Sequence, residues 1–259
     1  LIENNQGLLT EGEPNGSDIN TACMGASVGD LNSDGHLDIY LTATQDHHLI
    51  QGSENGFIDV SSSVGLPVPE QPQMLWGSQI LDYNNDGLWD ILAASSGFTM
   101  VSSTGVEIAP YPLWLMEQTA INQFQEVGAQ FGFPQESTTR AVLAHDINSD
   151  GVLDIFATSA DHSANIWLSE GCTANNWVTI TAPDNSIVTV VAGDKRQKIH
   201  LTKTPGFAAS MPSTAHIGLG ETETIDWIEV SIPWVGNKYI LGPLETRRRL
   251  VFTPSAIVE

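Results

Sequence analysis

The chain has 259 residues, of which 31 are acidic and nine are lysine or arginine, so its formal charge at neutral pH is −22. This excess of negative charge argues against nucleic acid or an anionic membrane as a direct partner, because both would repel the protein. No apolar run reaches the roughly 18 residues that a transmembrane helix needs, so no membrane insertion is expected.

Residues 1–10 resemble the third strand and turn of the repeating units that follow, and not their first strand. We therefore expect the chain to begin in the middle of such a unit. Two explanations are open. Either these strands complete another unit and close a ring, or the chain is the latter part of a longer polypeptide, which is the explanation we favour.

A nine-residue pattern, D-x-N-x-D-G-x-x-D, then occurs at residues 30–38, 82–90 and 146–154. Glycine at position 6 allows a sharp turn, and oxygen side chains fall at positions 1, 3, 5 and 9. Calcium prefers six to eight oxygen ligands, so we predict about three ions, one per loop. The variable position 7 would contribute its backbone carbonyl. The predicted ligands are Asp30, Asn32, Asp34, His36, Asp38, Asp82, Asn84, Asp86, Leu88, Asp90, Asp146, Asn148, Asp150, Val152 and Asp154.

Short apolar, β-prone runs flank each loop, so each unit is predicted to be strand, calcium turn, strand. Position 12 is never glutamate, which distinguishes these loops from a helix–loop–helix calcium site. Metal-free turns rich in Asp, Asn and Gly are the competing interpretation. The repeated aspartate at position 9 favours the metal, because a turn alone does not require it.

The spacing of the loops predicts blades of a β-propeller. Their first aspartates are 52 and 64 residues apart, and strand-like segments at residues 49–66 and 113–133 bring each blade to about four strands. Residues 97–112 lengthen the second unit and are predicted to be a loop excursion with a small hairpin. Three loops are too few for a closed ring. Further blades or a neighbouring chain are therefore expected to cover the open edge.

After residue 170 the pattern becomes an alternation of polar and apolar residues, which is typical of half-buried antiparallel strands. We predict an all-β chain in which propeller blades over residues 1–170, a partial ring or part of a longer one, precede a small antiparallel β-sandwich or barrel over residues 171–259. The expected strands of this second module lie at 176–181, 186–191, 197–201, 215–220, 226–233 and 248–252.

Both parts resemble known families. The loops with their flanking strands resemble the FG-GAP/VCBS repeats of integrin-type propellers. Residues 176–180, 216–220 and 225–230 resemble the UnbV/ASPIC module of cartilage acidic protein-like sequences, although residues 232–236 depart from that family's usual Trp-Pro-x-Gly order. The resemblance implies a calcium-binding propeller in a secreted or surface protein, with a role in adhesion, recognition or, occasionally, catalysis.

Several histidines are candidates for chemistry outside the loops. The pairs Asp46-His47-His48 and Asp161-His162 could ligate a transition metal or act as a general base, but solvated loops are the interpretation we favour. His36, His145 and His216 are expected to pack or face solvent. No serine or cysteine nucleophile motif accompanies them, so we assign no catalytic residue and lean away from an enzyme.

The seven tryptophans raise the alternative of carbohydrate binding. Trp76 and Trp234 are the surface candidates, whereas Trp167, Trp177 and Trp227 lie in predicted strands and are expected in the core. Trp89 falls inside the second loop.

Two further features leave alternatives open. Cys23 and Cys172 are either one disulfide or two thiols. The run Arg247-Arg248-Arg249 either meets an acidic neighbouring chain or, as we favour, guards a solvated strand edge.

The sequence therefore predicts a secreted or cell-surface, calcium-stabilised interaction or structural protein of the adhesion type. An enzyme with a pocket at the propeller axis and a carbohydrate-binding module are the alternatives. A protein partner or neighbouring chain is expected, and a glycan is a second candidate ligand.

Overall fold

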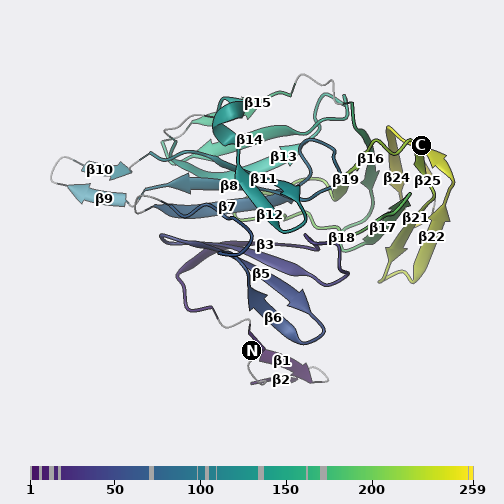
Figure 1. The fold of residues 1–259 in the computed structure, drawn as a ribbon, viewed down its shortest axis with the longest axis horizontal. Coiled ribbons are helices and arrows are strands. Elements are labelled where there is room, and N and C mark those ends of the chain that lie inside the picture. The colour runs from purple at the N-terminus through teal and green to yellow at the C-terminus, as the bar shows by residue number, and fades with distance from the viewer. Residues whose placement is uncertain are drawn as a thin grey trace.

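The computed structural model is an all-β protein in which blade-like sheets are followed by a β-sandwich (Figure 1). It describes residues 2–5, 8–11, 15–16, 19–69, 73–97, 99–102, 105–108, 110–133, 137–161, 163–169, 174–255 and 257–258. One 3-10 helix, η1 (Gly128–Phe131), lies in this part of the chain. None of its helices is long and apolar enough to cross a membrane.

Three sheets have the meander order of propeller blades, with every neighbouring pair antiparallel. The first blade consists of β3 (Cys23–Gly29), β4 (Asp38–Ala43), β5 (His47–Ser53) and β6 (Gly56–Asp59). The second consists of β7 (Met74–Leu81), β8 (Asp90–Ser96), β11 (Trp114–Ala120) and β12 (Gln123–Glu126). The third consists of β13 (Thr139–His145), β14 (Asp154–Ser159) and β15 (Ala164–Trp167). Each predicted calcium turn joins the first two strands of its blade, as expected, but the third blade has three strands rather than four among the described residues.

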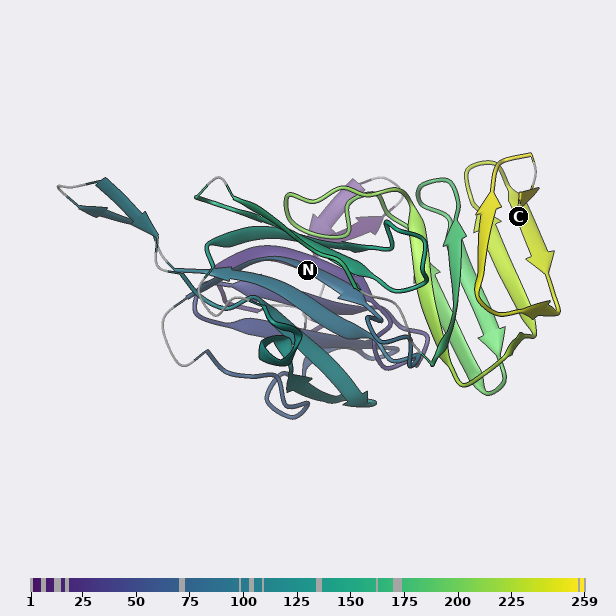
Figure 2. The same cartoon turned by 90° about the horizontal axis from the view of Figure 1, so that it is seen from above.

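Two hairpins lie outside the blades. β1 (Ile2–Asn5) pairs with β2 (Leu8–Glu11) as a separate two-stranded sheet. β9 (Thr99–Ser102) pairs with β10 (Gly105–Ile108), which confirms the hairpin predicted within residues 97–112. Figure 2 shows this second hairpin projecting from the end of the molecule opposite the sandwich.

The blades stack through apolar faces. Tyr40 and Leu49 of the first blade pack in one buried cluster with Ile91 and Trp114 of the second, and a further cluster joins the second blade to the third. All seven residues of β8 are buried, because this strand lies in the blade that is covered on both faces. The apolar run at residues 91–94 in the middle of β8 fits a sheet that is enclosed on both sides.

The C-terminal module is a sandwich of two four-stranded sheets around one apolar core. One sheet has the order β19 (Thr214–Gly220), β16 (Asn176–Thr181), β24 (Arg248–Phe252) and β25 (Ile257–Val258). The other has the order β18 (Lys195–His200), β17 (Ile187–Ala192), β21 (Trp227–Ile232) and β22 (Asn237–Leu241). The short strands β20 (Thr224–Ile225) and β23 (Leu244–Glu245) pair beside them.

Two expectations for this module were incomplete. β16 and β24 pair in parallel, because the last long strand returns beside the first after the intervening strands have crossed to the other sheet. β22 was not predicted, because it begins one residue after the turn residue Gly236 and alternates half-buried and exposed residues.

The sandwich stands against the loop end of the blades (Figure 2). The segment 201–213 leaves it and lies along the first strands of the blades. Ser27 donates a hydrogen bond to the carbonyl of Pro205 (3.2 Å), and Phe207 packs on Trp76 with ring centroids 5.8 Å apart. The module is therefore joined to the blades by more than the chain connection.

Candidate metal centres

The three nine-residue loops adopt one backbone conformation. Position 4 (Ser33, Asn85 and Ser149) and the glycine at position 6 all have positive φ, between +60° and +94°. Few residues other than glycine adopt this region readily. The conserved turn places the side chains of positions 1, 3 and 5 on the inside of the loop in each copy.

The first aspartate of each loop holds the turn closed. In the first loop, the two carboxylate oxygens of Asp30 accept hydrogen bonds from the backbone amides of Asp34 (3.0 Å) and Gly35 (2.9 Å). Asp82 and Asp146 make the same pair of bonds in the other loops. In the first two loops each of these oxygens retains a further lone pair for a cation. In the third loop Asp146 also accepts the amide of Ser149 and the Arg249 guanidinium.

The residues at positions 3 and 5 are also bonded alike. Asn32 accepts a bond from the amide of Asp34 (3.1 Å) and donates its side-chain amide to the Asp34 carboxylate (2.9 Å). The other Asp34 oxygen accepts from the amide of His36 (2.8 Å). These bonds recur at Asn84 with Asp86 and at Asn148 with Asp150.

The aspartate at position 9 has a role that the sequence pattern alone did not indicate. Asp38 accepts one bond from the amide of Leu31 (2.9 Å) and one from the amide of Gly52 (3.0 Å) in the third strand of its blade. Asp90 and Asp154 accept the corresponding pairs. This carboxylate therefore fixes the loop to its blade, besides being a predicted metal ligand.

The charge of the loops fits a divalent cation. Burial, and then the neighbouring charges of Asp34 and Asp30, raise the pKa of Asp38 to about 6. Burial and the charge of Asp86 raise the pKa of Asp82 to about 7. Clustered, partly dehydrated carboxylates repel one another, and a cation would remove this repulsion.

The donor set must include more than acidic side chains. Within the described residues, no three or more His, Cys, Asp or Glu side chains converge into a group that could hold an ion by themselves. The amide oxygen at position 3 and the backbone carbonyl at position 7 would therefore have to complete the coordination. Such an all-oxygen set fits calcium.

The second loop is docked into the sandwich. The side-chain amide of Asn85 donates to the carbonyl of Gly151 (2.9 Å), so its oxygen is the atom that His216 Nε2 approaches at 2.7 Å. His216 Nε2 then carries the proton, and Nδ1 accepts a bond from the Thr179 hydroxyl (3.1 Å). Lys195 donates its ammonium to the carbonyl of Asp86 (2.5 Å).

The third loop is docked against the same module. The Arg249 guanidinium forms an ion pair with the Asp146 carboxylate and lies 5.7 Å from the centre of the Trp177 ring. That ring covers Gly151, where an added Cβ atom would come within 2.1 Å of it. The arginine run therefore meets an acidic loop of its own chain, which corrects the expectation of a solvated strand edge for Arg249.

The first loop is not docked. An added Cβ at Gly35 would meet nothing within 4 Å. Within the described part of the chain, no lysine or arginine pairs with the carboxylates of Asp30, Asp34 or Asp38.

The histidine pair of the first blade is structural. Both ring nitrogens of His47 are occupied, by the Tyr40 hydroxyl (2.7 Å) and the Pro67 carbonyl (2.6 Å), and burial lowers its pKa. His48 bonds to the Asp59 carboxylate (2.8 Å). The favoured interpretation of solvated loops was thus wrong for His47, which is buried. His162 lies outside the described residues.

The remaining candidates divide between surface and interior. Trp234 is exposed, as predicted, whereas Trp76 is half-buried beneath the Arg140 guanidinium at 3.7 Å. Cys23 is an exposed free thiol, and Cys172 lies outside the described residues.

Blades stacked face to face, each with an oxygen-rich turn between its first two strands, define a propeller-type repeat protein. Residues 82–157 match the family of FG-GAP-like repeats. Residues 184–258 match the ASPIC and UnbV family. The chain therefore carries an FG-GAP-like repeat region followed by an ASPIC and UnbV module. No curated protein matches the chain.

Proposed function

We propose that the chain is a calcium-stabilised interaction or structural protein, with one ion in each of the three loops. The observation that supports the proposal is the threefold recurrence of the same hydrogen-bonded turn around a cluster of three carboxylates. The ligands would be the fifteen residues predicted above, with position 7 contributing its backbone carbonyl.

The role of the ions in this proposal is architectural. A bound ion supplies positive charge to the loop, and the chain's own residues do the rest. The aspartates at positions 1 and 5 hold the turn closed. That at position 9 ties it to the third strand of the blade, or, in the third blade, to Ser169 just after that strand. In the second and third loops the stiffened turn is also the surface on which the module rests.

We further propose that the protein acts outside the cell or at its surface, in adhesion or recognition. FG-GAP-like repeats are typical of such proteins, and short calcium loops of moderate affinity suit a medium with millimolar calcium. Exposed apolar side chains on the outer parts of the blades, Ile58 (63%), Ile166 (58%) and Leu168 (62%), support a neighbouring chain or further blades as the partner.

Thermal unfolding with and without a chelator tests the calcium proposal. Stripping the ions with EGTA should lower the melting temperature by about 10 °C or more, because ligands that bind only the folded state stabilise it by mass action. Adding back calcium should restore it, whereas equimolar magnesium should restore much less. Titration calorimetry should give about three sites. An unchanged melting temperature in EGTA would falsify the proposal.

A further inference from the structure

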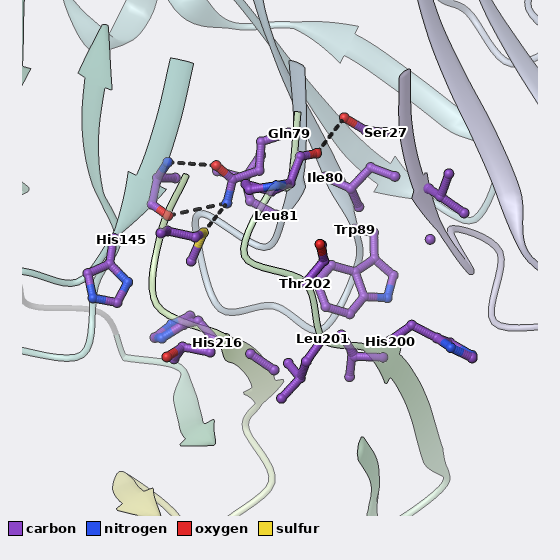
Figure 3. A pocket seen from close by; sticks show the side chains of 18 of the residues that line it. Ser27, Gln79, Ile80, Leu81, Trp89, His145, His200, Leu201, Thr202 and His216 are labelled. Atoms are coloured by element: carbon purple, nitrogen blue, oxygen red, sulfur yellow. Dashed lines mark hydrogen bonds between the residues drawn. The ribbon is translucent and has the colours of Figure 1, made fainter. Parts of the chain in front are cut away.

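A cavity of about 440 Å³ lies between the blades and the sandwich (Figure 3). Its walls include the first strands of the three blades, the end of β18, the segment 201–213 that follows β18, and residues of β16, β19 and β24. Boundaries between domains are common places for small-molecule sites, and this volume is within the usual range of such sites.

One wall of the cavity is apolar. Ile80 and Trp89 of the second blade face Leu201 of the module, as Figure 3 shows. Val28 and Leu37, which also line the cavity, expose 58% and 38% of their surface. A ligand with an apolar body would remove this surface from water, at about 25 cal/mol for each Å² covered.

The other notable feature is an unpaired positive charge. Lys198, half-buried on β18, lines the cavity, and its ammonium makes no ion pair or hydrogen bond within the described residues. It also lines an adjoining hollow of about 300 Å³, together with His36 and His200. An unpaired ammonium beside apolar surface is unexpected in a protein whose formal charge is −22.

The two acidic residues of the lining already have partners. Asp30 accepts backbone amides of its own loop. Asp146 accepts the Arg249 guanidinium and the amide of Gly151. The Lys198 ammonium is therefore the charged group that remains for a ligand.

We propose that this cavity binds a small amphipathic anion, with an aliphatic or aromatic body against the apolar wall and a carboxylate or sulfonate on Lys198. His216, which also lines the cavity, has both ring nitrogens bonded within the protein, so the lining indicates binding rather than turnover. The proposal rests on the cavity and its charge and does not require that the loops bind calcium.

The test uses the fluorescent anion 8-anilinonaphthalene-1-sulfonate, titrated into the whole chain in excess calcium. We expect saturable binding at one site. Lys198→Gln should weaken it about tenfold, because an ammonium–anion hydrogen bond is lost. Val28→Phe should abolish it by filling the cavity. The matched control is Lys203→Gln, at an exposed lysine outside the lining, which should leave binding unchanged.

Competition tests the class of ligand. Decanoate should displace the dye, whereas decanol, which has the same tail without the charge, should do so at least tenfold less well. Each variant must retain the wild-type melting temperature in calcium. Absence of binding, equal displacement by acid and alcohol, or binding unchanged by both Lys198→Gln and Val28→Phe would each overturn the proposal. None of these outcomes bears on the chelation experiment, so the two proposals fail separately.

Discussion

The first loop and the other two have the same pattern and the same internal hydrogen bonds, yet their surroundings differ. Residues 30–38 lie at the edge of the cavity, and Gly35 has open space around it. Residues 82–90 and 146–154 are pressed against the sandwich, where Asn85 bonds to His216 and Asp146 pairs with Arg249. The same local structure therefore serves one blade as a turn and the other two as a docking platform.

The comparison separates the contacts that stabilise the turn itself from those that depend on where the turn lies in the molecule. Contacts shared by the three loops, such as those of the first and last aspartates, belong to the turn itself. Contacts present only in the second and third loops belong to the assembly of the two modules. Variants at matching positions can therefore measure the turn and the interface independently.

The largest difference is expected at the glycine of position 6. Gly35→Ala should cost about 1 kcal/mol, from the left-handed backbone alone. Gly151→Ala should cost about 3 kcal/mol, because its Cβ would also collide with the Trp177 ring. Urea unfolding of both variants in calcium measures the difference. Equal losses of stability in the two variants would show that contact with the sandwich does not add to the cost of a side chain in the third loop.

The next effect is a dependence on pH through His216. Burial, and then the charges of Arg249 and His145, lower its pKa to about 4, although the charge of Asp150 opposes this. The unfolded chain therefore binds a proton more readily, and stability is lost as the pH falls from about 6.5 towards 4. At pH 5 the loss should be about 2 kcal/mol.

Denaturant midpoints between pH 7 and pH 5 check this expectation, with His216→Gln as the variant. The variant should be less stable at pH 7 but should show a flatter decline. His200→Gln is the comparison, because His200 is an exposed histidine of the same module whose pKa is also lowered, by burial and then by the charge of Lys198. It should flatten the decline less than His216→Gln does. If His216→Gln kept the full wild-type decline of stability between pH 7 and pH 5, a group other than His216 would cause that decline.

The smallest effect is expected for Asp82→Asn, whose effect on stability should change sign between calcium and EGTA. In calcium, Asp82→Asn should lower the stability, because a ligand is lost. In EGTA it should raise the stability by about 1 to 2 kcal/mol, because a buried carboxylate whose pKa is raised to about 7 is removed. Melting curves of both proteins in both buffers give the comparison. Asp30→Asn, in the undocked loop, should show the same reversal more weakly.

Much of the fold could be predicted because it depends on short-range sequence patterns. The position of each loop between two strands and the hairpin within residues 97–112 follow from turn residues and periodicity. The contacts of Arg249 with Asp146 join residues 103 positions apart in the chain, and no local pattern reports them. The burial of His47 likewise depends on Pro67 and Trp114, which reach it only in the folded protein.

The path of the segment 201–213 has consequences for folding during synthesis and for resistance to proteolysis. Pro205 accepts a bond from the first blade, the backbone of Gly206 passes close to Ser78 of the second, and Met211 contacts Gln79. The segment can settle only after the blades that it touches have formed, which suits synthesis from the N-terminus. A protease that nicked the connection between blades and sandwich should accordingly yield two fragments that still migrate as one particle until denatured.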